Sequence, residues 1–562
     1  MIEKRRFAFE LMIGWMVRIY NQFALVFPVI LLSLMALKCR IPKLFWSVLS
    51  RVRLLYDEKF TKQLALDLGQ RIQLPRNYPG NASRLIGIGT FDNCLMKFLT
   101  SYEGVRSGGD GNVNYNFVNW FTSPVHEDDI PAGLASQLDS PWDELITNEV
   151  VIGWIDDSEG ILEHLETDWT HFTTADSVLD HPEYASNRPK MIYQNHVPTI
   201  NGTAGYDDVR KVLFVIIQLM VVTLGISYVF VIGDQQSYSR VVWLLRSEPE
   251  NFRQIIPFPG DFHFAVHALM AIHILWWKYL VEDLLWRSQF DVSSIHETWD
   301  RVDLYNRHRH CYETVIVAIL AYVTEVFSTE DLADPVALME TVSANNGGMT
   351  SLLHFLYDFG LPWLGFRNAI RGNNSVKMDS MYCICLDWYR VAGKYLYARI
   401  CVDHIWITTN LKASFLQVWH RYRTVSKLGN AGRNIPRDQA NEFENLELKQ
   451  WNPKDPSNID PTLTMLNGLR EIDEPMRSLF GVQRDPLREY TATKQNQVDA
   501  IVDILRTRLG TNPRVFLRPT RGQIKRNNPF GSGIRPWIRV EASRQTRNEY
   551  VRRQLETPPM FL

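Results

Sequence analysis

The chain lacks several features that would assign it to common classes of protein. Its six cysteines include no CxxC pair, so reduced thiols in a cytosolic or nuclear protein are expected rather than a disulfide framework. The CxC at Cys383 and Cys385 lies in an apolar run, which favours plain burial over metal binding. No internal repeat or low-complexity tract is visible. The formal net charge is only −2 over 562 residues, so the chain as a whole is not an evident polyanion binder.

Long hydrophobic runs are also few. The segment Phe23–Leu37 is short for a membrane span and contains Pro28, and no small-residue cleavage site follows it. The segment Val212–Ile232 is long enough to cross a bilayer, but Gly225 divides it into a helix-length piece and a strand-length piece. Such a division is typical of a buried helix that leads into a central strand. We therefore expect a soluble protein, with a membrane-anchored structural protein as the alternative.

The composition is that of a globular protein, with 46% hydrophobic residues and 17 tryptophans. A chain of this length is expected to form two to four structural units. Changes in pattern along the sequence predict a helical region (1–78), an α/β core (79–270), a helical insertion (271–430), a final core helix with its packing (431–485) and a basic C-terminal arm (486–562).

Basic residues concentrate near both ends of the chain. Two predicted N-terminal helices carry Lys43, Arg51 and Arg53, a pattern that fits either a helix-turn-helix reader of DNA or a helical cap with solvated charges. Between Arg514 and Arg553 there are eleven basic residues against two acidic ones. This run fits an arm that binds the DNA phosphate backbone, a nuclear import signal or a solubilising tail.

Carboxylates follow the predicted strands at the points where those strands end. The run YVFVIGDQ places Asp234 directly after a buried strand, and SRLIGIGTFDNC places Asp92 at the end of another. Parallel α/β sheets carry their chemistry at this edge. A third strand candidate, over residues 149–157, ends in Asp156 and Asp157, which are rivals of Asp92. Strand-end aspartates are also common as simple turn formers.

Three such acids are the parts of a two-metal phosphoryl-transfer site. Mg²⁺ prefers carboxylate oxygens, and two ions can clamp the attacking and leaving oxygens of an in-line displacement. Neighbouring strands lie about 4.8 Å apart, so two strand-end aspartates on adjacent strands can share one ion. The third ligand would come from the helix that starts near Asp438, where Glu442 is the first candidate and Glu444 and Glu447 are competitors.

Six motifs in order carry a resemblance to a known family. They are FDNC (91–94), GDQQSYSR (233–240), IPFPGDFHF (256–264), FRNAIRGNN (366–374), KYLYAR (394–399) and GRNIPRDQANEFENLELK (432–449). Together they resemble a large eukaryotic family that is built on a domain of unknown function and is multiplied in fungal and animal genomes. That family in turn resembles transposon-derived DDE-type transposases. The match runs from about residue 10 to residue 480.

The resemblance implies a ribonuclease-H-like mixed sheet interrupted by a large helical insertion. It implies catalytic and metal-binding roles for Asp92, Asp234 and Glu442, with Mg²⁺ or Mn²⁺ and without a small-molecule cofactor. It further implies DNA as the partner, a nuclear location and assembly as a homo-oligomer. A catalytically inactive relative that binds nucleic acid or protein remains the alternative function. Residues expected near the site are Asn93, Gln235, His263, Asp438, Asn445 and Lys449.

Several basic and histidine residues have two interpretations each. His263 is expected to contact a phosphate or the scissile strand, or else to bond to the backbone of its turn. Arg367 and Arg371, one helical turn apart, fit either a clamp on the DNA backbone or a buried ion pair. The C-terminal residues Arg521, Lys525 and Arg526 are the expected DNA contacts of the basic arm.

Overall fold

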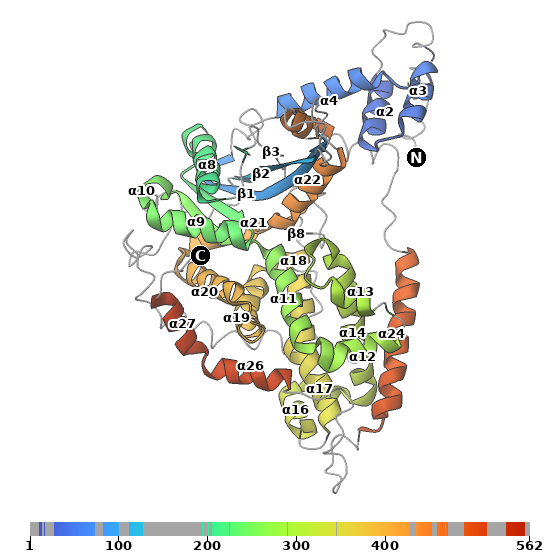
Figure 1. The fold of residues 1–562 in the computed structure, drawn as a ribbon, viewed down its shortest axis with the longest axis vertical. Helices are drawn as coiled ribbons and strands as arrows, with labels where there is room; N and C mark the ends of the chain where they lie inside the picture. The colour runs from blue at the N-terminus through green and yellow to red at the C-terminus, as the bar shows by residue number, and fades with distance from the viewer. Residues whose placement is uncertain are drawn as a thin grey trace, which may run out of the picture.

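A computed structural model of the protein describes residues 10–13, 16, 27–72, 82–99, 112–126, 194–195, 200–201, 205–426 (apart from 224, 289, 291, 344 and 345), 434–451, 458–469 (apart from 467), 488–513 and 535–556. In this part the chain is mostly helical and contains one mixed sheet, so its class is α/β. Figure 1 shows the N-terminal helices at one end of the molecule, the sheet next to them and a helical body beyond.

Three N-terminal helices pack with a segment from late in the chain. The helices are α2 (Phe27–Lys38), α3 (Lys43–Arg51) and α4 (Glu58–Ile72). Leu34, Trp46 and Ala65 share a hydrophobic cluster with residues of segment 458–469. A Cβ built on Gly69 would lie 1.7 Å from the Thr464 carbonyl oxygen, so glycine is required where α4 crosses this segment. A helix-turn-helix role for the region stays a prediction.

The sheet combines antiparallel and parallel strands. Its strands are β1 (Ala82–Leu99), β2 (Asn112–His126), β3 (Gln194–Asn195), β4 (Ile200–Asn201), β5 (Tyr228–Gly233) and β6 (Ile255–Pro259). The order is β3-β2-β1-β5-β6, with β4 also paired to β2. The pairs of β2 with β1, β3 and β4 are antiparallel, whereas β1 with β5 and β5 with β6 are parallel.

The apolar segment 212–232 forms a helix followed by a strand, which confirms that interpretation of the sequence. Helix α8 (Tyr206–Ile216) continues as the π-helical turns η5 (Ile217–Thr223) and gives way to β5 after Gly225, whose φ is +70°. Ile216 and Met220 are buried against Val229 and Val231 of the strand. Helices α9 (Gln235–Ser247) and α10 (Pro249–Phe252) then connect β5 to β6.

A large helical body follows β6. Its elements are α11 (Asp261–Trp276), η6 (Trp277–Val281), α12 (Glu282–Arg287), α13 (Val292–Glu297), η7 (Val302–Leu304), α14 (Tyr305–Val326), α15 (Thr329–Ala333), α16 (Pro335–Ser343), α17 (Gly347–Phe355), η8 (Leu356–Gly360), α18 (Leu361–Gly372), α19 (Ser375–Val391), α20 (Tyr395–Asn410) and α21 (Ala413–Tyr422). The short strands β7 (Thr424–Val425) and β8 (Ile435–Pro436) pair before α22 (Arg437–Trp451) begins.

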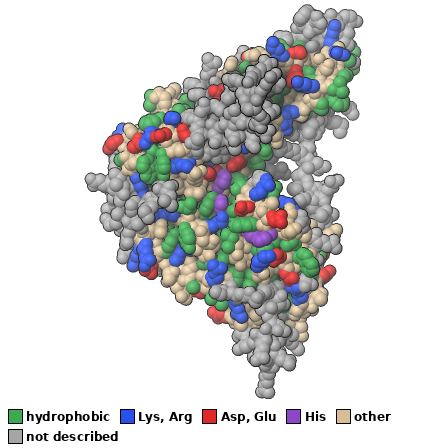
Figure 2. All heavy atoms as spheres, viewed as in Figure 1, with side chains coloured by type: hydrophobic (Ala, Val, Ile, Leu, Met, Phe, Trp, Pro, Cys, Tyr) green, Lys and Arg blue, Asp and Glu red, His purple; other side chains and the backbone are tan. Residues whose placement is uncertain are grey.

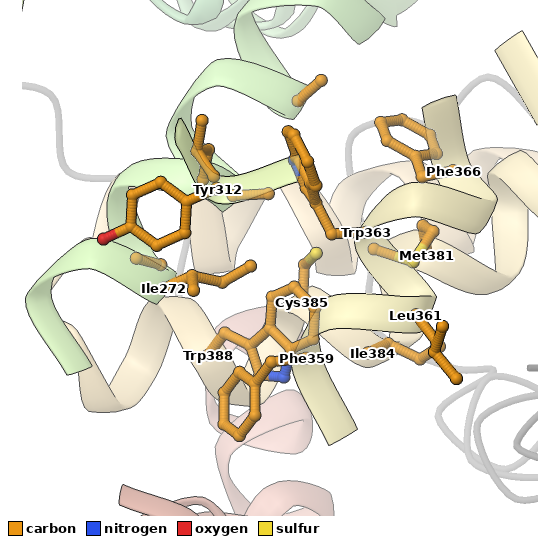
Figure 3. Close-up of a cluster of buried hydrophobic side chains, with 14 of the residues drawn as sticks. Ile272, Tyr312, Phe359, Leu361, Trp363, Phe366, Met381, Ile384, Cys385 and Trp388 are labelled. Carbon is orange, nitrogen blue, oxygen red and sulfur yellow. The ribbon is translucent and has the colours of Figure 1, made fainter. Parts of the chain in front are cut away.

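The core of this body is rich in aromatic side chains. Phe359 and Trp388 stack with ring centroids 5.0 Å apart, and Cys385 is buried beside them (Figure 3). Burial raises the pKa of the Cys385 thiol well above its usual range. Cys383 and Cys385 are both free and buried, as the sequence predicted.

One helix in the described residues, 261–286, is long and apolar enough to cross a membrane by length and composition. However, 83% of its apolar window is buried inside the protein. It is the central helix of the body, which fits a soluble protein.

The described parts of the C-terminal region are helices that pack on this body. They are α24 (Arg488–Leu509), α26 (Pro536–Gln545) and α27 (Arg547–Glu556). Arg506 bonds to Glu325, and Arg508 pairs with Asp283. Arg547 of α27 lies 3.7 Å from Asp387. These arginines are paired with acidic residues of the protein itself, and a role of the C-terminal arm in binding DNA stays a prediction. Arg521, Lys525 and Arg526 lie outside the described residues.

Candidate functional site

Asp234 stands at the end of the central strand β5 and begins helix α9. Its Oδ1 accepts a hydrogen bond of 2.7 Å from the backbone N–H of Ser237, so one oxygen caps the helix. A Cβ on Gly233 would lie 2.8 Å from the Cβ of Ser237, so glycine permits this tight turn. Among the described residues, Oδ2 of Asp234 makes no hydrogen bond, which leaves one carboxylate oxygen for a ligand.

Strand register places Asp92 beside Asp234. In the parallel pair of β1 and β5, Thr90 is the partner of Ile232. Asp92 lies two residues after Thr90, and Asp234 lies two residues after Ile232. Strand β1 continues past this point in its pairing with β2, where Asp92 faces Asn119. The two backbones are therefore neighbours at the carboxyl edge of adjacent strands. The side chains of Asp92 and Asn93 lie outside the described residues, as do Asp156 and Asp157.

Helix α22 brings a third acidic segment to the same edge. The N–H of Gly260 donates to the carbonyl of Gly233 at 2.8 Å, so the turn after β6 lies next to the turn that carries Asp234. The carboxylate of Asp438 accepts hydrogen bonds from the backbone N–H groups of Phe262 and His263, each 3.0 Å long. Asp438 thus caps helix α11 across the structure, where the positive end of the helix dipole favours a negative charge.

Gly260 is required for this contact, which leads to a testable prediction. A Cβ at this position would lie 2.3 Å from Oδ2 of Asp438. Gly260→Ala is therefore expected to lower the free energy of unfolding by about 1–3 kcal/mol, as overpacking does. Gly347→Ala is the control, because the nearest atom to its Cβ would be 4.0 Å away. Equal thermal unfolding midpoints for the two variants would contradict the assigned role of Gly260.

His263 bridges two acids of α22. Its Nδ1 lies 3.2 Å from Oδ2 of Asp438, and its Nε2 lies 3.6 Å from Oε1 of Glu442. Burial by itself lowers the pKa of His263. Hydrogen bonds to Asp438 and Glu442 and the nearby charge of Asp234 have a larger, opposite effect, so the pKa lies well above its usual value. The imidazole is therefore cationic at neutral pH. The expected bond of the His263 ring to the backbone of its turn is not found among the described residues; its partners are carboxylates of α22.

The charge of Asp234 also acts on Tyr397, a second residue next to this cluster. Burial, followed by the negative charges of Asp234 and Asp438, raises the pKa of Tyr397. Tyr397 stacks on His267, one helical turn after His263, with ring centroids 4.0 Å apart. Figure 2 shows histidine and acidic side chains together in a hollow near the middle of one face of the molecule. Asp234, His263, Asp438 and Glu442 thus share one site.

The other acids of α22 are placed differently. Glu447 pairs with Lys38 of α2 at 2.6 Å, so it joins the N-terminal helices to α22 and does not compete for the third position. The side chain of Glu444 lies outside the described residues. Of the residues expected near the site, Asn445 is buried, Lys449 is exposed, and Gln235 bonds to Ser239 within α9.

The structure favours the buried alternative for Arg367. Its side chain is 14% exposed and forms an ion pair with Glu313, which Arg309 approaches at 3.6 Å. Arg371 is exposed in the last turn of α18. The ion-pair interpretation therefore holds for Arg367, and a contact of Arg371 with DNA stays a prediction.

Sequence reasoning missed a buried charge network behind the site. Arg423 donates two hydrogen bonds to Asp261, of 2.7 and 2.8 Å, and one of 2.5 Å to Asp379. His404 and His420 also bond to Asp379, at 2.7 and 2.9 Å. Asp261 is the aspartate of the PGDF motif, so the network fixes the turn that holds His263. The only local signal was an acidic residue in a predicted buried turn.

Within the described residues no group of three or more histidine, cysteine or acidic side chains forms a metal site by itself. The carboxylate of Asp92 falls outside that set. Comparison with known proteins found no match: no family model, no curated protein and no solved structure is significantly similar to this chain.

Proposed function

We propose that the chain is a transposase-like DNA-binding protein with a ribonuclease-H-like core, in which Asp92, Asp234 and Glu442 hold divalent metal ions for phosphodiester hydrolysis or strand transfer. The observation that carries the proposal is the meeting of three separate segments at one sheet edge. Two of them are neighbouring parallel strands in register at Asp92 and Asp234. The third is helix α22, which packs on β1, β5 and α11.

Strand topology supports the ribonuclease-H-like part. In that fold an antiparallel meander is followed by parallel strands, the first of which pairs with the first strand of the meander. The order β3-β2-β1-β5-β6 follows this plan, with helices between β4, β5 and β6. The helical body between β6 and α22 then occupies the place of an insertion before the last catalytic helix.

The donor set fits Mg²⁺ or Mn²⁺. Both ions prefer hard carboxylate oxygens, and the three acids supply only such oxygens. Glu442 is 38% exposed, and its Oε1 lies 3.6 Å from Nε2 of His263, so its carboxylate is both within reach of solvent and next to the acidic cluster. The raised pKa of His263 reports an excess of negative charge at this point. When bound, the ions would polarise the scissile phosphate and lower the pKa of an attacking water.

The residues of the chain would have distinct roles. Asp234 is fixed by its cap on α9, and Asp438 holds α22 against the start of α11, so both strand-end and helix acids are positioned before any ligand arrives. Cationic His263, between Asp438 and Glu442, would orient Glu442 and limit repulsion among the carboxylates. DNA as substrate would imply a nuclear location.

A relative that binds DNA without cutting it is the second candidate. It is favoured by the fact that Asp234 and Asp438 each cap a helix, a structural role that requires no metal. Incubation of the purified protein with supercoiled plasmid in Mg²⁺, Mn²⁺ or Ca²⁺ separates the two. Nicking that requires Mg²⁺ or Mn²⁺ supports the enzyme, whereas salt-sensitive binding without nicking supports the inactive relative.

A further inference from the structure

The KYLYAR motif, residues 394–399, has no assigned role in the proposed chemistry although it lies beside the acidic cluster. A tight turn through Gly393, with φ of +73°, joins α19 to α20. The N–H of Lys394 donates to the carbonyl of Tyr389 at 2.8 Å, which fixes the start of α20. The first residues of this helix are therefore held rigidly.

Among the described residues Lys394 forms no ion pair with a carboxylate; burial lowers its pKa, and the charge of Asp300 acts against that effect. Its Nζ donates to Nδ1 of His267 at 3.2 Å and lies 5.6 Å from the centre of the Trp299 ring. Burial and the charge of Lys394 lower the pKa of His267 to about 3, so His267 is a neutral acceptor for the ammonium. A half-buried ammonium that is bonded to a neutral acceptor and to no carboxylate can bind an external anion.

The next two residues expose large hydrophobic side chains to solvent. Tyr395 is 64% exposed and Leu396 is 57% exposed, although the following residue, Tyr397, is buried against His267. His267 lies one turn, roughly 6 Å, from His263 on α11. The ammonium of Lys394 is therefore within roughly 10 Å of His263, a distance that a few nucleotides of a single strand cover.

We infer that Lys394 and Tyr395 form a subsite for single-stranded DNA beside the proposed metal site, with Lys394 on a phosphate and the Tyr395 ring stacked on an unpaired base. This inference rests on the proposed function, because it takes DNA as the substrate. An exposed aromatic ring next to a cation is the arrangement by which proteins bind single strands without reading sequence. A paired base does not offer its face to such a ring, so the subsite distinguishes an opened strand from an intact duplex.

Binding without metal tests this subsite separately from cleavage. The probes are a fluorescein-labelled oligothymidylate and a labelled hairpin duplex, both in EDTA. Tyr395→Ala is expected to weaken oligothymidylate binding about tenfold and to leave hairpin binding unchanged. Tyr395→Phe should bind like the wild type. Lys394→Gln should reduce the slope of log K against log salt by about 0.7 for the single strand.

Trp286→Ala is the control, because Trp286 is also exposed, at 67%, but lies on α12. Equal weakening by Tyr395→Ala on both probes, or no weakening on either, overturns the inference. A wild type that binds oligothymidylate through Tyr395 but never nicks plasmid refutes the metal chemistry and leaves the subsite standing. A wild type that nicks plasmid while Tyr395→Ala binds normally refutes the subsite alone.

Discussion

Replacing Arg423 by leucine is expected to lower the free energy of unfolding by about 3–5 kcal/mol, the cost of breaking a buried ion pair from one side. The guanidinium is fully buried and bonds to two carboxylates, Asp261 and Asp379. Nearby Arg423 holds the pKa of Asp379 well below its usual range, against the effect of burial. Removal of the cation would leave two buried acids without their main partner. Urea unfolding followed by tryptophan fluorescence measures the loss.

Arg506→Leu is the matched control. Arg506 also contacts two acids, Glu325 and Asp503, but its side chain is 44% exposed. Exposed pairs contribute about 0–1 kcal/mol, so this variant should unfold close to the wild type. Comparable losses in the two variants would show that the Arg423 network does not hold the PGDF turn. If Arg423→Leu does not fold, Arg423→Lys, which keeps the charge but loses the fork of donors, should show a smaller loss in the same direction.

Glu442→Gln is expected to reduce metal-dependent nicking of plasmid at least about a hundredfold. Loss of a residue that only supports a metal ligand already costs 10- to 100-fold, and Glu442 is proposed as a ligand itself. Asp234→Asn should have a similar effect, while its amide oxygen can still cap α9. Because both substitutions are nearly isosteric, circular dichroism and the unfolding midpoint should change little.

Glu447→Gln is the control for this pair, since Glu447 lies on the same helix but bonds to Lys38. It should keep nicking activity near that of the wild type. Full activity in Glu442→Gln, or an equal loss in Glu447→Gln, would remove Glu442 from the proposed site.

Local sequence patterns were informative where short-range physics decides the structure. The Gly-Asp ending of β5 predicted both a buried strand and an acid at its carboxyl edge. Gly225 correctly indicated that segment 212–232 is a helix and a strand. Both features depend on neighbouring residues: a β-branched run favours a strand, and a glycine with positive φ ends the helical turns.

Side-chain contacts between segments far apart in the sequence could not be predicted from such local patterns. Asp438 lies at the start of its own helix, but it caps α11, which begins far away in the sequence. The two interpretations of Arg367 could not be separated from the sequence, because its partner Glu313 lies on another helix. Nothing local to Arg423 indicated that this cation would be buried at the centre of a network. Such contacts depend on how helices meet, which periodicity does not specify.

The most direct test of the central claim is the position of Mn²⁺ in a crystal of the protein, located by its anomalous scattering. The account predicts one or two peaks within about 2.1 Å of carboxylate oxygens of Asp92, Asp234 and Glu442, and their loss in Glu442→Gln crystals. Full Mn²⁺ occupancy elsewhere, with Glu442 still turned to His263 and no peak between the three acids, would contradict it.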